Sequence, residues 1–135
     1  MNNSLNVLIH FLTLANKHIR RFSWGLDGLW FSEFVILHHL NQCVEKKMRR
    51  GDLAEQLGLT PAGITKILWP MEKIGLIRRE STPHDGRVSY VVITASGERN
   101  VAESMSRAIE LAEKMFPPQK LEKYPGIEDM LSDVS

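Results

Sequence analysis

The chain has a single cysteine, Cys43, so neither an intramolecular disulfide bond nor a cysteine-based zinc site can form within it. Its five histidines lack close ligand spacing, and the adjacent His38 and His39 would point about 100° apart on a helix. No stretch approaches the length of an uninterrupted apolar membrane span, and the N-terminus lacks a basic region followed by an apolar one. We therefore expect no metal site, no membrane span and no signal peptide, with a cytoplasmic location as the default.

Catalytic motifs are missing as well. The sequence contains no Ser–His–acid spacing, no glycine-rich phosphate loop and no paired-carboxylate motif. We therefore expect neither an enzyme nor a bound cofactor. Cys43 would act as a redox switch only if positive charge, such as that of Lys46 and Lys47, stabilised its thiolate. An inert cysteine is the simpler interpretation.

Charge is unevenly distributed along the 135 residues, whose 43% hydrophobic and 24% charged content is typical of a single globular domain. Residues 46–99 carry ten Lys and Arg against six Asp and Glu, whereas residues 1–45 are balanced and residues 100–135 carry four against seven. A local basic region is what a polyanionic partner requires. The alternative is a chance excess of positive charge on a solvated surface.

The first predicted helix spans residues 4–22 and is apolar over an unusually wide surface. Two neighbouring rows recur at steps of three and four residues: Leu5, Leu8, Leu12, Ala15, Ile19 and Phe22, and beside them Val7, Phe11 and Leu14. A surface this wide exceeds what one core contact needs. Either the helix is central to the fold, or one row faces another subunit.

Three further helices are predicted at residues 31–40, 50–57 and 61–74. Gly58 ends the second of these, Thr60 and Pro61 suit the N-cap and first position of the third, and Gly75 closes it. Pro70 lies inside the third helix, where it lacks an N–H and clashes with the preceding turn. We expect a kink or break near residues 66–69.

The hydrophobic period changes after Gly75 and predicts a β-hairpin. Residues 76–81 and 88–94 have strand character, and residues 82–87 form a turn by composition. Thr94 then caps a long helix over residues 95–116, ended by Pro117 and Pro118, and a short helix follows around residues 127–134. The predicted fold is mainly α (α+β), a winged helix-turn-helix with a two-stranded wing and long helices forming a dimer interface.

The helix-turn-helix of residues 50–74 carries the functional prediction. In such a unit the second helix enters the major groove of DNA, with its N-terminal residues against base edges and phosphates. Thr65 would hydrogen-bond a base or phosphate, Ala62 would touch a thymine methyl group, and Lys66 would neutralise a phosphate. The candidate DNA-binding residues on this helix are Thr60, Ala62, Gly63, Thr65 and Lys66. A solvated helix surface is the alternative for each.

The hairpin tip supplies a second candidate contact with DNA. His84 and Arg87 would reach an adjacent minor groove, whose negative potential favours arginine. Asp85 cannot bind phosphate, and its expected role is to orient an arginine through a bidentate pair. The alternative is an ordinary polar turn.

Two segments and the wing resemble the MarR family of regulators. The first runs from Gly51 to Pro61 (GDLAEQLGLTP) and the second from Met71 to Arg79 (MEKIGLIRR), and they are followed by DGR at 85–87 and VITASG at 92–97. The resemblance covers about residues 5–116 and adds Arg79 to the candidate DNA-binding residues. It implies a triangular homodimer joined by the first helix, the fifth helix and the C-terminal segment. Each subunit would place one winged lobe on half of a pseudo-palindromic operator.

The resemblance also implies a candidate small aromatic effector, because many members are repressors released by such ligands. Candidate lining residues for its pocket are Phe11, Trp24, Trp30, Phe31 and Phe34, with plain core packing as the alternative. One domain over residues 1–135 is expected, with a DNA-binding lobe at about 31–94 and dimerisation helices at about 4–22 and 95–134. The alternative function is a winged-helix protein–protein module without DNA binding. It remains an alternative because Ala62, Gly63 and Pro70 depart from the family pattern.

Overall fold

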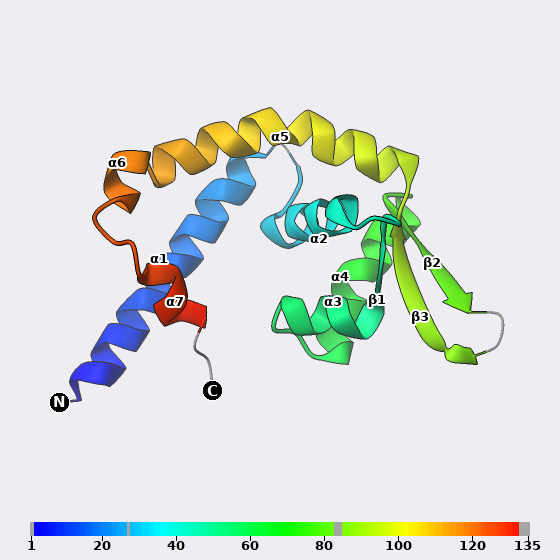
Figure 1. Ribbon diagram of the computed structural model, residues 1–135, viewed down its shortest axis with the longest axis horizontal. Helices are drawn as coiled ribbons and strands as arrows, with labels where there is room; N and C mark the ends of the chain where they lie inside the picture. The colour runs from blue at the N-terminus through cyan, green and yellow to red at the C-terminus, as the bar shows by residue number, and fades with distance from the viewer. Residues whose placement is uncertain (1, 27, 83–84, 133–135) are drawn as a thin grey trace.

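The fold is mostly helical with one small sheet, as the computed structural model shows for residues 2–26, 28–82 and 85–132 (Figure 1). For residues 85–87 only the backbone is described. In chain order the elements are α1 (Asn3–Gly25), α2 (Phe31–Gln42), β1 (Lys47–Arg49), α3 (Arg50–Gln56), α4 (Pro61–Lys73), β2 (Ile77–Thr82), β3 (Asp85–Ile93), α5 (Ala95–Met115), α6 (Pro118–Leu121) and α7 (Ile127–Ser132). The predicted winged helix-turn-helix is therefore present.

The sheet contains one strand more than the predicted hairpin. Its order is β1-β3-β2, with both neighbouring pairs antiparallel. Lys47 lies opposite Val92 and Arg49 opposite Tyr90, so β1 covers the edge of β3 that the hairpin leaves open. No strand was predicted at these residues, since a three-residue strand with two charges has no period of its own.

The hydrophobic core lies where α2 is surrounded by α3, α4, α5 and the sheet. Its largest fully buried side chains are Ile36, Leu37, Leu40, Leu53, Ile64, Met71 and Val101. Helix α1 contributes little to this core: Ser23 is its one buried residue among those described. The core therefore belongs mainly to the winged lobe.

Helix α4 continues through Pro70 to Lys73. Of the kink or break predicted near residues 66–69, the break is therefore not observed, and the kink stays a prediction. Pro70 costs one backbone hydrogen bond near the end of the helix. Its neighbours on the inner face, Leu68 and Met71, are 3% and 0% exposed. Burial of these side chains offsets the missing bond and holds the last turn in place.

Helix α5 joins the lobe to the rest of the chain. Figure 1 shows it running from the base of the wing to α6, with the end of α1 against its middle. Arg107 donates from Nε to the carbonyl oxygen of Gly25 at 3.1 Å, and His18 lies 5.4 Å from Phe116 between ring centroids. The short helix α6 was not predicted. Across the described part of the chain, no helix is both long and apolar enough to cross a membrane.

Candidate nucleic-acid interface

The leading end of α4 is exposed and ordered by its own cap. Thr60 Oγ1 accepts a hydrogen bond from the Gly63 backbone N–H at 3.0 Å. Thr60, Ala62 and Lys66 are exposed to solvent. Gly63 is half-buried, and a Cβ at this position would lie 3.2 Å from Thr60 Oγ1. Glycine therefore leaves room for the cap, and the positive end of the helix dipole faces outward.

Thr65 has two partners within the protein. Its hydroxyl donates to the Pro61 carbonyl oxygen at 2.8 Å and accepts a hydrogen bond from Arg50 Nη2. Arg50 begins α3, so this contact bridges the two helices of the helix-turn-helix. Arg50 was not among the predicted site residues, because nothing in its local sequence indicates a partner on another helix.

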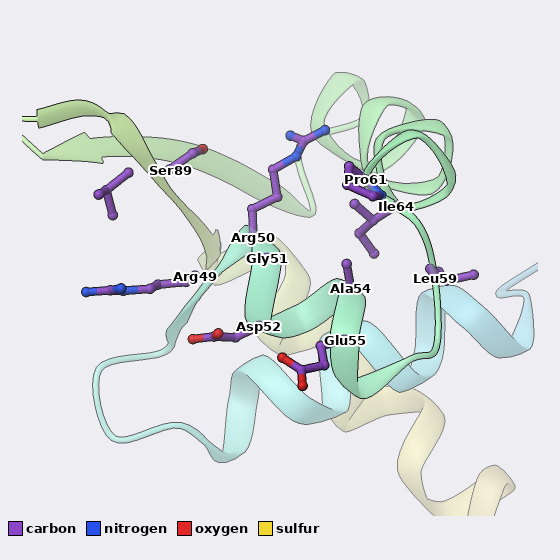
Figure 2. A pocket seen from close by; sticks show the side chains of 11 residues that line it. Arg49, Arg50, Gly51, Asp52, Ala54, Glu55, Leu59, Pro61, Ile64 and Ser89 are labelled. Atoms are coloured by element: carbon purple, nitrogen blue, oxygen red, sulfur yellow. The ribbon is translucent and has the colours of Figure 1, made fainter. Parts of the chain in front are cut away.

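A hollow of about 640 Å³ lies between α3, the start of α4 and β3. Figure 2 shows Arg50 extending from α3 toward α4, with Ser89 on the strand opposite. The hollow is lined by Arg49, Arg50, Gly51, Asp52, Ala54, Glu55, Leu59, Pro61, Ile64, Val88 and Ser89. It separates the leading end of α4 from the wing, and among the described side chains none of the predicted DNA-binding residues lines it.

Arg79 lies at the other side of α4, where it forms a 3.2 Å ion pair with Glu72. The exposed Trp69 stands nearby, with Lys73 Nζ 4.1 Å from its ring centroid. These four side chains line a second hollow of about 270 Å³. Arg79 also lines a small crevice together with Arg50, whereas Thr60, Ala62 and Gly63 line neither hollow.

The wing is described only in part. Its strands β2 and β3 form the predicted hairpin. His84 lies outside the described residues, and so do the side chains of Asp85 and Arg87, whose backbone belongs to β3. The predicted minor-groove contacts of these three residues stay predictions.

The base of the sheet carries a charge network. Lys47 Nζ lies 2.9 Å and Arg78 Nη1 3.2 Å from the Glu80 carboxylate. The hydrogen bond from Lys47 lowers the pKa of Glu80, and the same bond raises the pKa of Lys47. Tyr90, opposite Arg49 in the sheet, raises the pKa of this arginine. These charges are therefore fixed around neutral pH, and basic groups flank the sheet.

An apolar hollow of about 230 Å³ lies between α1, α2 and α5. It is lined by His18, Ile19, Phe22, Phe31, Ala112, Met115 and Phe116. Phe22 packs edge-on against Phe31 and Phe34, at centroid distances of 5.8 and 5.7 Å. Of the five predicted pocket residues, only Phe31 lines this hollow.

The other four predicted pocket residues lie elsewhere. Phe34 is buried in the core. Phe11, Trp24 and Trp30 are 40%, 74% and 43% exposed, and Arg20 lies over the Trp24 ring at 5.5 Å. His18 and Phe22 were not predicted to line a pocket, because periodicity alone does not show which side of α1 faces α5.

Cys43 is half-buried, and its thiol donates to the His39 carbonyl oxygen at 3.3 Å, one turn earlier in the chain. Among the residues that the structure describes, no group of three His, Cys, Asp or Glu side chains is arranged to hold a metal ion.

Comparison with known proteins confirms the resemblance drawn from the sequence. Residues 31–89 match the sequence model of the MarR family. No curated protein matches the chain. The structure is similar to that of BpsR from Bordetella bronchiseptica, whose DNA binding is regulated by 6-hydroxynicotinic acid. That similarity has a TM-score of 0.83 at 18% identity, over 100% of this chain and 99% of BpsR.

Two other similar structures contain DNA. One is a MarR family transcriptional regulator from Streptomyces coelicolor, with a TM-score of 0.83 at 16% identity, over 98% of this chain and 89% of that one. The other is a mutant MarR from E. coli bound to operator DNA, with a TM-score of 0.78 at 18% identity, over 96% and 94% of the two chains. At these identities the likeness establishes a shared fold.

Proposed function

We propose that this chain, whose winged lobe matches the MarR family, is a transcription regulator that binds a pseudo-palindromic operator as a homodimer. The observation that carries the proposal is the exposed leading end of α4, where Ala62, Thr65 and Lys66 face solvent. A helix presented in this way fits the major groove, where each base pair has a distinct pattern of donors and acceptors. DNA complexes of two proteins with the same fold support this interpretation.

The DNA contacts would come from α4 and the wing. Thr60, Ala62, Gly63, Thr65 and Lys66 form the proposed groove-facing end, and Lys66 carries no ion pair with another described residue. Further contacts with the flanking DNA backbone and minor groove would be made or organised by Arg79, His84, Asp85 and Arg87. The basic excess of residues 46–99 supplies the attraction to phosphate.

A second copy of the chain would cover the apolar surface of α1. Seven apolar side chains in the first half of this helix are between 40% and 60% exposed: Leu5, Val7, Leu8, Ile9, Phe11, Leu12 and Leu14. Further exposed apolar groups follow in the C-terminal segment: Phe116, Leu121, Tyr124, Ile127, Met130 and Leu131. Monomeric proteins rarely leave such a contiguous apolar surface in water. We assign residues 4–22 and 95–134 to dimerisation and residues 31–94 to DNA binding, within one domain of residues 1–135.

A small aromatic effector would occupy the hollow between α1, α2 and α5. The hollow is lined by aromatic and aliphatic side chains, with His18 as a polar group near Phe116. It joins the proposed dimer helices to the first helix of the lobe, so a ligand there would alter the angle between them. BpsR, which has the same fold, responds to an aromatic acid. We therefore propose a repressor that such a ligand releases from DNA.

A mobility-shift assay against genomic fragments at low and moderate salt tests the DNA-binding proposal. Specific retardation that weakens steeply with salt is the expected result, because phosphate contacts release counterions. If no fragment is retained at either salt concentration, the winged-helix protein–protein module becomes the better account.

A thermal-shift panel of aromatic acids tests the effector proposal separately. A ligand that binds only the folded state raises the melting temperature. Replacing Phe22 with alanine should abolish that shift, whereas replacing the distant Trp69 with alanine should leave it unchanged. A panel without any stabilising compound would count against this effector class.

A further inference from the structure

Arg50 occupies the junction between the two helices of the helix-turn-helix. It is the first residue of α3 and is half-buried, and it lines both the large hollow and a small crevice beside α4. In Figure 2 its side chain extends toward α4, whereas Asp52 and Glu55 point to another side of α3. The guanidinium group therefore lies away from the nearest carboxylates of its own helix.

The partner of Arg50 has little hydrogen-bonding capacity left for a base. A threonine hydroxyl has one donor and two acceptor lone pairs. The donor of Thr65 is used by the Pro61 carbonyl oxygen, and one lone pair accepts from Arg50 Nη2. Thr65 could donate to a base only by breaking its bond to the helix backbone, so its hydroxyl is better suited to hold Arg50 than to read sequence.

Arg50 keeps most of its own capacity. A guanidinium group has five N–H donors. Among the described residues Thr65 is the one acceptor bonded to Arg50, and no carboxylate lies within ion-pair distance of it. The remaining donors are thus available to an anion that approaches the gap between α4 and the wing.

We infer that Arg50 binds a phosphate of the DNA backbone and that Thr65 positions it for this contact. The inference rests on the proposed DNA binding and changes the role predicted for Thr65. The first helix of a helix-turn-helix crosses the DNA backbone, and Arg50 begins that helix. Arginine in a fixed orientation can bind phosphate with two parallel hydrogen bonds. Thr65 is therefore a positioning residue and Arg50 the contact.

Salt-dependent binding to a mixed-sequence DNA duplex, long enough for two half-sites, tests the inference. Phosphate contacts are independent of sequence, so the operator is not required. Arg50→Ala should weaken binding about tenfold. It should also reduce the slope of log affinity against log salt by about 0.9 for each phosphate that is no longer neutralised. Arg50→Lys keeps the charge without the paired donors and should retain most of the slope with lower affinity.

A double-mutant cycle tests the positioning role. Thr65→Val should weaken DNA binding when Arg50 is present and have no further effect in the Arg50→Ala background. Thr65→Ser restores the hydroxyl and should restore the affinity. Melting temperatures of all variants, measured in parallel, exclude loss of folding as the cause.

Each adverse outcome has a distinct meaning. If the unmodified protein fails to bind the duplex, the proposed function is wrong and the inference falls with it. If it binds but Arg50→Ala keeps the same affinity and slope, only the inference is wrong. If Thr65→Val still weakens binding in the Arg50→Ala background, Thr65 contacts DNA directly and its positioning role is refuted.

Discussion

Gly97, in the first turn of α5, lies directly against the carbonyl oxygen of Leu76 at the start of the wing. A Cβ added at Gly97 would overlap that oxygen and press on the Ile93 side chain. Thr94 strengthens the same junction. Its Oγ1 accepts a hydrogen bond from the Gly97 N–H at 3.0 Å and donates one to the Gly75 carbonyl oxygen at 2.6 Å. The base of the wing and the long helix are therefore fixed to each other.

Gly97→Ala should destabilise the fold by about 1–3 kcal/mol, since the overlap is with backbone that cannot rotate away. Urea unfolding measures the change. Gly51→Ala is the matched control, because it also lies in the first turn of a helix but has open space around its Cβ position. The control should be neutral or stabilising by up to about 1 kcal/mol. Equal stability of the two variants would contradict the role given to Gly97.

Leu8→Glu should convert the proposed dimer into a monomer and abolish tight operator binding, because a charge would be buried against the second copy. Sedimentation equilibrium measures the mass. Val44→Glu makes the same change at a side chain that is 99% exposed on the α2–β1 connection, and it should stay dimeric. An unmodified chain that sediments as a monomer would refute the dimer itself.

Lys66→Ala should weaken DNA binding by a similar factor for every sequence, because the side chain is expected to neutralise a phosphate. Fluorescence anisotropy with several duplexes provides the comparison. Lys73→Ala, on the same helix, removes a charge that stacks over Trp69 and should have a smaller effect. A change in sequence preference for Lys66→Ala would instead assign this lysine to a base.

Arg87→Ala should weaken DNA binding with little change in melting temperature, because the wing tip is expected to enter a minor groove. Arg99→Ala removes the same charge from the exposed surface of α5 and serves as the control. Unchanged affinity of Arg87→Ala for a retained genomic fragment would remove the wing tip from the mechanism.

Glu80→Gln should flatten the acid side of the stability profile. Lys47 lowers the pKa of Glu80 in the folded protein. The ion pair therefore stabilises the fold above the ordinary carboxylate pKa, and this contribution is lost as the pH falls through the lowered value. The difference in unfolding free energy between the variant and the unmodified protein should shrink over that range. Glu122→Gln, with no ion pair to a described residue, should show no such trend.

Local rules explain what the sequence predicted well. The caps at Thr60 and Thr94 depend on residues within one turn, and both hydroxyls accept from the backbone N–H three residues later. Gly58 and Gly75 have φ values of 66° and 84°, which glycine adopts without strain after a helix. Element types and helix ends followed from these short-range patterns.

Contacts between distant segments explain what the sequence did not predict. Strand β1 exists because Lys47–Arg49 pairs with β3, much later in the chain. The Arg50–Thr65 contact spans 15 residues and two helices. The apolar hollow likewise needs α1, α2 and α5 together, so Phe22 and His18 could not be selected from the periodicity of α1 alone.

The length of α5 has a mechanical consequence. Its 21 residues make a rigid rod about 31 Å long between the wing and α6. A tilt of about 10° at the α6 end would move the base of the wing by about 5 Å, nearly half the width of a major groove. In the proposed dimer, a slight rearrangement where the two copies meet would thus be amplified into a mismatch with DNA, while the interior of each lobe stays unchanged.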